Sequence, residues 1–232
     1  MATITIDASD GSGSFKAFVA RPADGGGPAV IAIQEIFGIN QVMRDICADL
    51  AEQGYIAVCP DLFWRQEPGI ELTDRTEAEW GRAFQLYQGF DEAKGVDDLK
   101  ATIAAARALQ GASGAVGTVG YCLGGKLAYL CATRTDADCN VGYYGVGIEA
   151  ALGEAGHIHR PLMLHIAEKD QFCPPEAQAQ IKEALAKVKH VSIHSYAGMD
   201  HAFARPGGAH YDEDAAETAN RRTREFFAKH LS

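Results

Sequence analysis

The sequence predicts an α/β protein in which a mostly parallel central sheet is covered by helices on both faces. Apolar runs that are typical of buried strands alternate with amphipathic helical patterns along the whole chain. No linker, internal repeat or shift in composition divides the 232 residues, a length that a single α/β domain commonly reaches. We therefore expect residues 1–232 to form one domain.

The expected strands are short apolar runs bounded by turn-forming residues. The first two, residues 3–6 and 15–20, flank the turn Asp10-Gly11-Ser12-Gly13 and predict an antiparallel opening of the sheet. The remaining strands are expected at residues 29–33, 55–59, 116–121, 141–144, 161–167 and 191–196.

The expected helices show apolar residues at helical spacing and residues that cap their ends. Asn40 can cap a helix that Gly54 ends, and Thr76 with Glu79 forms a capping box. The stretch 62–72 contains proline and glycine and is expected to be a long surface loop. Helices are expected near residues 40–53, 76–87, 91–110, 124–133, 175–188 and 214–230.

The charge balance limits the class of partner. With 21 Lys and Arg against 31 Asp and Glu, the formal net charge is −10, which argues against nucleic acid as the main ligand. No apolar run approaches the about 18 residues that a membrane span needs, and the N-terminus lacks the features of a secretory signal. We expect a cytoplasmic monomer that acts on a small molecule, without a nucleic-acid or membrane partner.

The six cysteines do not form a metal-binding pattern. None belongs to a CxxC pair, and no group of Cys and His has the spacing of a zinc site, so no metal is expected. In a reducing compartment each cysteine is expected to be a buried free thiol, with Cys122 as the exception.

Cys122 lies in a turn with the pattern of a catalytic nucleophile. The segment Gly120-Tyr121-Cys122-Leu123-Gly124-Gly125 follows an expected strand and precedes an expected helix, as in the G-x-S-x-G nucleophile elbow, with cysteine in place of serine. Glycines are needed there because strand and helix pass closely. The helix N-terminus favours a thiolate, and the Leu123 N–H can stabilise an oxyanion. The alternative is a glycine-rich turn with a buried cysteine.

An acid and a histidine follow the cysteine in the chain order of such sites. Asp170 comes 48 residues after Cys122, and His201 comes 31 residues after Asp170. Each follows an apolar strand, so both are expected at the sheet edge that carries the elbow. Glu168 or Asp200 could take the acid's place. The other histidines are expected to be structural within strands (His165, His194) or solvated (His157, His159, His190, His210, His230).

A carboxylate follows the buried strand at residues 29–33. The segment Gln34-Glu35-Ile36-Phe37-Gly38 is the loop that in such folds supplies the second backbone N–H for an oxyanion, here that of Ile36. A glutamate between apolar neighbours at this place is unusual, because a buried carboxylate is unfavourable unless it is paired. The alternative is a solvated loop glutamate.

With these segments placed, the whole sequence resembles the dienelactone hydrolase family. The resemblance implies an α/β-hydrolase fold that needs no cofactor and acts on enol-lactones carrying a carboxylate. It also implies a triad of Cys122, His201 and Asp170, with Glu35 helping to deprotonate the thiol and Arg205 holding the substrate carboxylate. The segments that carry it are residues 34–38, Val58-Cys59-Pro60-Asp61-Leu62, residues 120–125, Gly142-Tyr143-Tyr144-Gly145-Val146-Gly147 and His201-Ala202-Phe203-Ala204-Arg205.

Some positions of the resemblance concern substrate binding. Tyr144 is expected to line the substrate site. Ala202 replaces the small hydroxylic residue that the family carries after the histidine. A second arginine for the substrate carboxylate is expected on the helix that opens near residue 76, where Trp80 occupies its position and Arg82 follows two residues later.

The expected reaction is hydrolysis of a lactone or ester through an acyl-enzyme, with dienelactone (4-carboxymethylenebut-2-en-4-olide) giving maleylacetate. The alternatives are hydrolysis of a different activated ester and a non-catalytic binding protein of the same fold. A dinucleotide-binding oxidoreductase is disfavoured. The segment Gly145-Val146-Gly147-Ile148-Glu149-Ala150 fits G-x-G-x-x-A, with Glu168 for a ribose contact, but Gly153, Gly156 and Pro161 leave little room for the helix that must follow.

Overall fold

The structure is a computed structural model that describes residues 2–231. Its eight strands form a mixed sheet with helices, which confirms the α/β class. The residues group into two compact units, Met1–Gly117 and Thr118–Ser232, and the boundary lies within the strand β5 (Ala112–Tyr121). The expectation of one domain stays a prediction.

The first unit opens with the antiparallel strands that the sequence predicts. Strand β2 pairs antiparallel with both β1 and β4, whereas β3 pairs with β4 in parallel, so that the order is β1-β2-β4-β3. Ile31 and Val58 lie opposite each other in the parallel pair and are fully buried. The strands are β1 (Ala2–Asp7), β2 (Ser14–Ala20), β3 (Gly27–Ile33) and β4 (Ile56–Pro60).

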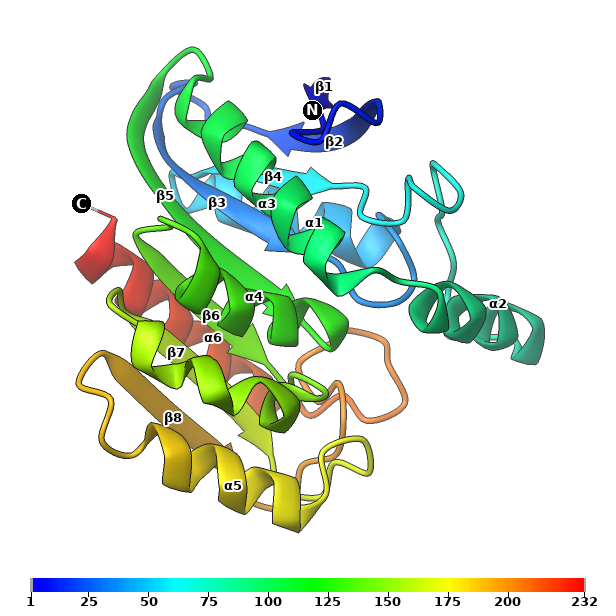
Figure 1. Cartoon of the computed structure of the whole chain (residues 1–232), viewed down its shortest axis with the longest axis vertical. Coiled ribbons are helices and arrows are strands. Elements are labelled where there is room, and N and C mark those ends of the chain that lie inside the picture. Colours follow the sequence, from blue (N-terminus) through cyan, green and yellow to red (C-terminus); the bar gives the residue numbers. More distant parts are fainter. Residues whose placement is uncertain (1, 232) are drawn as a thin grey trace. The chain divides into compact units, whose positions relative to one another are not determined.

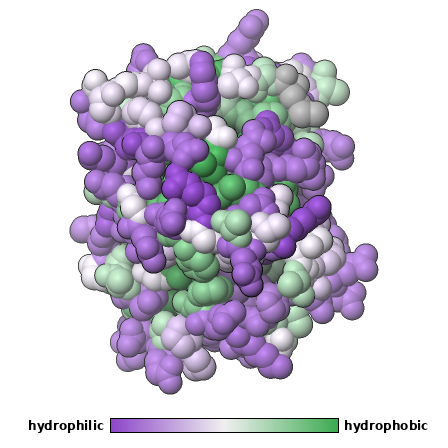
Figure 2. All heavy atoms as spheres, turned by 90° about the vertical axis from the view of Figure 1, so that its right-hand side faces the viewer, coloured by the Kyte–Doolittle hydropathy of each residue, from purple (hydrophilic) through white to green (hydrophobic). Residues whose placement is uncertain are grey.

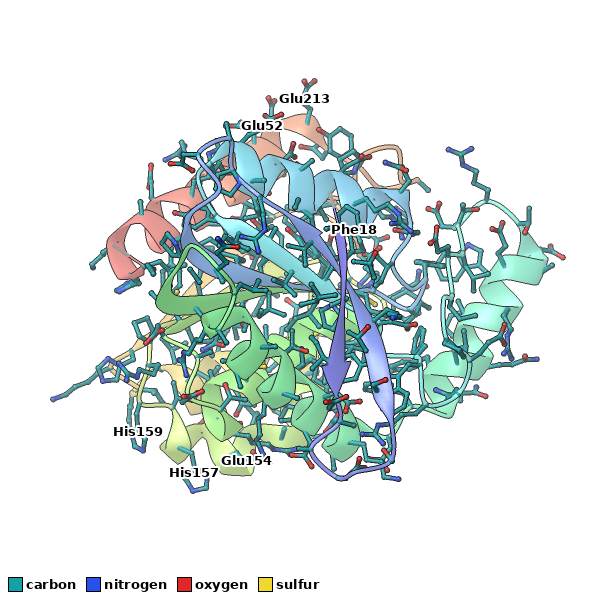
Figure 3. All side chains as sticks on the ribbon, turned by 90° about the horizontal axis from the view of Figure 1, so that it is seen from above. Phe18, Glu52, Glu154, His157, His159 and Glu213 are labelled. Carbon is teal, nitrogen blue, oxygen red and sulfur yellow. The ribbon has the colours of Figure 1, made fainter. Side chains whose placement is uncertain are left out.

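Helices α1 (Gln41–Glu52) and α3 (Glu92–Arg107) cover opposite faces of these strands (Figures 1 and 3). The Asn40 side chain caps α1 by accepting from the Met43 N–H at 3.2 Å, as predicted. Thr76 caps α2 (Glu77–Gln88) in the same way. The Glu79 carboxylate reaches back to Thr73, from whose N–H it accepts at 2.9 Å, so the capping extends further upstream than the predicted box.

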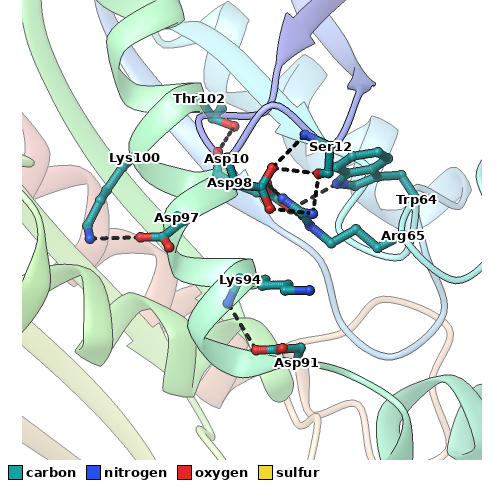
Figure 4. A network of polar contacts seen from close by, with 10 residues as sticks. All are labelled: Asp10, Ser12, Trp64, Arg65, Asp91, Lys94, Asp97, Asp98, Lys100 and Thr102. Carbon is teal, nitrogen blue, oxygen red and sulfur yellow. Dashed lines mark hydrogen bonds and ion pairs between the residues drawn. The ribbon is translucent and has the colours of Figure 1, made fainter.

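A buried carboxylate connects three segments of the first unit (Figure 4). Asp98 of α3 is 1% exposed and accepts hydrogen bonds from the Trp64 indole at 2.8 Å and from two nitrogens of Arg65 at 2.9 and 2.7 Å. Arg65 also donates to Asp10 at 3.0 Å and to Ser12 at 2.6 Å, in the turn between β1 and β2. The charge on Asp98 is therefore compensated, as burial requires.

The predicted surface loop at residues 62–72 is only partly at the surface. Residues 66–69 are exposed, whereas Leu62, Phe63 and Ile70 are buried. The buried aromatic ring of Phe63 packs edge-on against Phe90, with the ring centroids 5.9 Å apart. The loop therefore contributes to the core of its unit, which its proline and glycine content did not indicate.

The second unit carries parallel strands with helices on both faces, as predicted. Strand β7 pairs in parallel with β6 and with β8. Helix α4 packs on β6 on one face, and α6 packs on β6 and β7 on the other (Figure 1). The elements are β6 (Cys139–Tyr143), β7 (Leu162–Ala167), β8 (Val191–Tyr196), α4 (Leu123–Arg134), α5 (Pro175–Leu185) and α6 (Glu213–His230).

Several elements differ from the predicted bounds by one to three residues, as α5 does, which ends at Leu185 and not at 188, and two differ more. Residues Ile148–His157 form a 3₁₀ helix, η1, where no helix was expected. It begins after Gly147, whose φ of 84° is left-handed, and its two glycines disfavour an α-helix there. Strand β5 begins at Ala112, four residues earlier than expected, because its first residues are small and mostly exposed and lack an apolar pattern.

One face of the molecule is mainly polar (Figure 2). The face in Figure 2 is dominated by hydrophilic residues, with small hydrophobic areas between them. His157 and His159 are exposed and point outward in Figure 3, which confirms that they are solvated. Among residues 2–231 no helix is long and apolar enough to cross a membrane. Among the described residues, the exposed large hydrophobic side chains are Phe84, Phe172 and Tyr211.

Candidate functional site

Cys122 occupies a strained turn between β5 and α4. Its φ of 56° and ψ of −115° lie outside the regions that a residue with a side chain normally adopts. The turn is held by its main chain, since the Cys122 N–H donates to the Tyr143 carbonyl at 3.1 Å and the Gly125 N–H donates to the Cys122 carbonyl at 3.0 Å. The other five cysteines are buried free thiols, as predicted, and Cys122 is partly exposed.

The glycines of the turn are required by close contact between main-chain segments. A Cβ atom on Gly120 would lie 1.9 Å from the Gly124 carbonyl oxygen, and one on Gly125 would lie 2.4 Å from that of Tyr143. Gly142 of β6 meets the same restriction, with 2.7 Å to the Gly125 oxygen. The steric reason that the sequence pattern predicts is therefore confirmed for Gly120, and the same restriction holds at Gly125 and Gly142.

Asp170 and His201 lie in contact after the ends of β7 and β8. Asp170 Oδ2 and His201 Nδ1 are 2.7 Å apart, and Asp170 Oδ1 accepts from the Phe172 N–H at 2.8 Å. Of the two alternative acids, Glu168 is exposed, and Asp200 accepts the main-chain N–H of His201 at 2.7 Å. The acid that reaches the imidazole is thus Asp170.

The imidazole of His201 is enclosed by aromatic rings. Tyr144 and Phe172 both meet it edge-on, with centroid separations of 5.2 and 4.9 Å. Burial acts to lower the pKa of His201, but the charge of Cys122 and hydrogen bonds with Asp170 and Cys122 outweigh it and raise the pKa to about 10. At neutral pH the structure therefore favours an imidazolium beside the sulfur.

This shift predicts how stability depends on pH. A histidine whose pKa rises from 6.5 to about 10 on folding contributes stability that is complete below about pH 6.5 and is lost as the pH rises through 10. We expect the thermal midpoint to fall over this interval. Cys122→Ala removes the charge that helps to raise the pKa and should move the fall to lower pH. Calorimetry from pH 6 to 10.5 measures the thermal midpoints of wild type and variant. If both fall over the same pH interval, Cys122 does not contribute to the raised pKa of His201.

Two further residues of the second unit have a left-handed backbone that sequence reasoning missed. Tyr144, directly after β6, has a φ of 37°, and Ala202, directly after His201, has a φ of 62°. Together with Cys122 they are the non-glycine residues with positive φ among residues 2–231. Strained backbone of this kind clusters at functional sites. No sequence signal marks these two positions, because neither is glycine or asparagine.

Arg205 lies buried in the turn that follows His201. It is 9% exposed, and its main-chain N–H donates to the Ala202 carbonyl at 3.0 Å. A Cβ on Gly208 would come within 3.0 Å of the Arg205 Nε, so the arginine side chain lies against main chain. A guanidinium that is mostly removed from water is a favourable partner for a carboxylate.

Glu35 and Ile36, in the first unit, are both 5% exposed, so Glu35 is not the solvated loop residue of the alternative interpretation. The loop is held by Gln34, whose side chain accepts from the Leu62 N–H at 3.1 Å. Gly38 has a φ of 77°, and a Cβ there would lie 1.9 Å from the Ile70 oxygen, so a glycine is required.

Trp80 and Arg82 of α2 have different environments. The Trp80 ring packs edge-on against Phe37, with 5.0 Å between centroids, and its indole N–H donates to the Asp74 carbonyl at 2.9 Å. Trp80 therefore contacts the loop that carries Glu35. Arg82 pairs with Glu67 on the surface and donates to Gln85 at 3.2 Å. Because their surroundings differ, Arg82 cannot take the place of Trp80 in a contact with a substrate.

The described residues contain no cluster of three or more His, Cys, Asp or Glu that could hold a metal ion. The arrangement around Cys122 can instead perform acyl transfer, which needs a nucleophile, a proton carrier and a donor for an oxyanion. Leu123 is the first residue of α4, where a main-chain N–H has no partner within the helix and can serve as that donor.

The sheet with its helices has the α/β-hydrolase fold, and the turn at Cys122 and the Asp170–His201 pair match the pattern expected of a catalytic site in this class. A crystal structure from Klebsiella pneumoniae, provisionally described as a dienelactone hydrolase, superposes with a TM-score of 0.82 at 29% identity and covers 99% of this chain and 100% of its own. The model of the dienelactone hydrolase family matches residues 15–231. The chain belongs to the dienelactone hydrolase family.

Relatives of known name agree with this family. A protein of Azospirillum brasilense, provisionally named carboxymethylenebutenolidase, is 51% identical over 100% of both chains. Carboxymethylenebutenolidase 1 of Cupriavidus pinatubonensis is 42% identical over 93% of this chain and 92% of its own. The chain is therefore a hydrolase of ester or lactone bonds, and the oxidoreductase and non-catalytic interpretations are set aside.

Proposed function

We propose that this hydrolase opens an enol-lactone that carries a carboxylate, with dienelactone (4-carboxymethylenebut-2-en-4-olide) as substrate and maleylacetate as product. The observation that supports it most is the contact of Asp170 with His201 beside a cysteine in a nucleophile turn. Relatives whose name denotes this reaction support the choice of substrate.

In the acylation step the Cys122 sulfur attacks the lactone carbonyl carbon. The electron pair of the C=O bond moves to the oxygen, which the Leu123 N–H stabilises. When the C=O bond re-forms, the bond from carbon to the enol oxygen breaks, and the His201 imidazolium gives its proton to that oxygen. Asp170 keeps the imidazole oriented through Nδ1, so that Nε2 carries the transferred proton. An enol is a good leaving group, which suits a thiol nucleophile.

In the deacylation step His201, now neutral, takes a proton from water as the water oxygen adds to the thioester carbon. The C–S bond then breaks, the sulfur leaves as thiolate, and the new carboxylic acid loses its proton to solvent. The enol of the product changes to the ketone in solution. The site returns to a thiolate beside an imidazolium, and the raised pKa of His201 favours the imidazolium.

Substrate recognition is assigned to Arg205 and Tyr144. The buried Arg205 guanidinium pairs with the substrate carboxylate, and the Tyr144 ring lines the site next to His201. The further roles carried over from the family stay predictions: thiol activation by Glu35, an oxyanion N–H from Ile36, and substrate contacts of Trp80 and Arg82.

A comparison of two substrates tests the proposal. Dienelactone and its methyl ester differ in the charge that Arg205 would bind, and a charge-assisted hydrogen bond corresponds to a factor of about 10–100. We expect kcat/KM, followed by ultraviolet absorbance, to favour the free acid by that factor. Arg205→Gln should remove the preference, whereas Arg221→Gln, on the exposed face of α6, should keep it. Hydrolysis of neither compound, or preference for the methyl ester, would refute the assigned substrate.

The remaining expectations concern the setting of the enzyme. We expect the enzyme to be a cytoplasmic monomer of one domain that is active without a cofactor. These expectations are compatible with a small hydrolase and stay predictions. Gel filtration and turnover after treatment with a chelator address the first and the last of them.

A further inference from the structure

A chain of buried polar side chains lies outside the groups used in the proposed reaction. His165 of β7 is fully buried, with Nδ1 at 2.7 Å from the Tyr196 hydroxyl and Nε2 at 3.1 Å from the Thr223 hydroxyl. The Thr223 oxygen lies 2.6 Å from the Tyr143 hydroxyl. This series of hydrogen bonds has two ends. At one end Arg222 donates to the Tyr196 hydroxyl oxygen at 3.1 Å, and at the other the side-chain carbonyl oxygen of Asn220 accepts from the Tyr143 hydroxyl at 3.0 Å.

The two ends determine the direction of every hydrogen bond between them. Arginine can only donate, so the Tyr196 oxygen accepts at one end, and a carbonyl oxygen can only accept at the other. Each hydroxyl in between has one proton to give, and an unpaired buried donor is unfavourable. Tyr196 therefore donates to His165 Nδ1, His165 donates from Nε2 to Thr223, and Thr223 donates to Tyr143.

His165 is neutral in this chain. Burial, followed by the nearby His194 and Arg222, holds the pKa of His165 well below its usual range. A neutral imidazole has one donor and one acceptor nitrogen, which is what a chain of a single direction needs. The His194 ring stacks beside it at 5.8 Å and completes the surroundings on the β8 side.

We propose that His165, with Tyr196, Thr223 and Tyr143, forms a hydrogen-bond chain of one direction, with His165 in the Nε2–H form, that positions Asp170 and His201. The chain connects α6 to the last residues of β6 and β8 and to the middle of β7. These residues are positioning residues, because none is placed at the reacting atoms.

The connection to the site runs through the ends of the strands. Tyr196 ends β8, and its carbonyl accepts from the N–H of Glu168 at 3.2 Å and of Met199 at 3.3 Å, in the loops that carry Asp170 and His201. The Tyr196 ring packs on Phe203 at 4.7 Å. On the other side, the His165 carbonyl accepts from the Tyr144 N–H at 2.8 Å, and the Tyr144 ring meets His201. A change in these hydrogen bonds therefore moves both Asp170 and His201.

The first test does not depend on catalysis. Long-range ¹H–¹⁵N spectra of the wild-type protein report which ring nitrogen of each histidine carries the proton, and His165→Gln identifies the His165 signals. We expect His165 to be neutral, with the proton on Nε2, between pH 6 and 8. A proton on Nδ1, or on both nitrogens, would contradict the direction of the chain.

The second test uses an isosteric pair and rests on the proposed function for its assay. Thr223→Val keeps the shape but removes the hydroxyl, and a small displacement of reacting groups is enough to slow the reaction strongly. We expect kcat for dienelactone to fall about 5–20-fold with KM within about twofold, and Thr223→Ser to restore kcat to within about twofold of wild type. Thr102→Val is the control, since the hydroxyl of this buried helical threonine bonds only the Asp98 carbonyl of its own helix, at 2.8 Å.

The outcomes separate this proposal from the proposed function. Unchanged kcat in Thr223→Val, or equal loss in Thr223→Val and Thr223→Ser, would refute positioning by the hydroxyl. Absence of dienelactone turnover in the wild type would refute the assigned substrate, and the same variants would then be compared on an activated ester that the wild type does hydrolyse. If Thr223→Val does not fold, the wild-type spectra still decide the direction of the hydrogen bonds, and Thr223→Ala takes the place of Thr223→Val in the comparison with Thr223→Ser.

Discussion

Replacing Cys122 by alanine should lower kcat/KM for dienelactone by at least about 10⁴-fold without unfolding the protein. The substitution removes the atom that forms the acyl-enzyme, and loss of a nucleophile leaves only the rate enhancement of binding and oxyanion stabilisation. The turn itself is held by main-chain hydrogen bonds of Cys122, which alanine retains. The loss of dienelactone absorbance measures the rate, and circular dichroism checks the fold.

Cys139→Ala is the matched control, because Cys139 is a buried free thiol of β6 that has no part in the proposed chemistry. It should keep kcat/KM within about threefold of wild type, an effect as small as that of a change outside the site. Mass spectrometry after brief alkylation should show one modified cysteine in the wild type and none in Cys122→Ala. Turnover by Cys122→Ala at a tenth of the wild-type rate or more would exclude Cys122 as the nucleophile.

Gly120→Ala should destabilise the protein by about 3–5 kcal/mol, measured as the free energy of unfolding in urea. The added Cβ would lie 1.9 Å from the Gly124 carbonyl oxygen and 3.0 Å from the Gly124 Cα. The obstacle is main chain, so no side chain can turn aside to make room. Either the strand separates from the helix start, or the turn that presents Cys122 changes shape.

Gly153→Ala provides the comparison for this prediction. A Cβ on Gly153, in η1, would meet no atom within 4 Å, and its φ is not in the left-handed region. We expect its effect on the free energy of unfolding to stay within about 1 kcal/mol, on the stabilising side. Similar stabilities of the two variants would show that the close approach at the elbow is not what requires a glycine.

The sequence predicted the alternation of strands and helices because each element carries its own local signal. The apolar run at 29–33 became the buried strand β3 (Gly27–Ile33), and Asn40 caps α1 as expected. Elements without such a signal were missed. The first residues of β5 are small and none of them is buried, and η1 contains two glycines.

The central residues of the candidate site were recognisable because chemistry constrains their order and their distance from strand ends. Asp170 and His201 were found in this way, and the structure brings them into contact. The His165 chain was not found, since the hydrogen bonds of Thr223 to His165 and to Tyr143 join residues 58 and 80 positions apart. Bonds of that separation leave no local pattern in the sequence.

Burial of single charges was also beyond the reach of the sequence. Asp97 and Asp98 are neighbours in α3, yet Asp97 pairs with Lys100 on the surface, whereas Asp98 is buried among Trp64 and Arg65 (Figure 4). The partners of Asp98 come from a segment more than 30 positions away. Periodicity shows which residues share a face but not which of them meets an arginine.

The close contact of glycine main chains around Cys122 has a consequence for how this enzyme can change over generations. Gly120 and Gly125, on either side of Cys122, lie against main-chain atoms, so a side chain at either position is incompatible with this turn. The loops that follow β7 and β8 carry larger side chains, among them Phe172 and Phe203, and the proposed substrate contact of Arg205. Substitutions in those loops can therefore change which ester is hydrolysed while Cys122 stays in its place. Substitutions at the glycines of the elbow instead prevent folding, so selection removes them whatever their effect on catalysis.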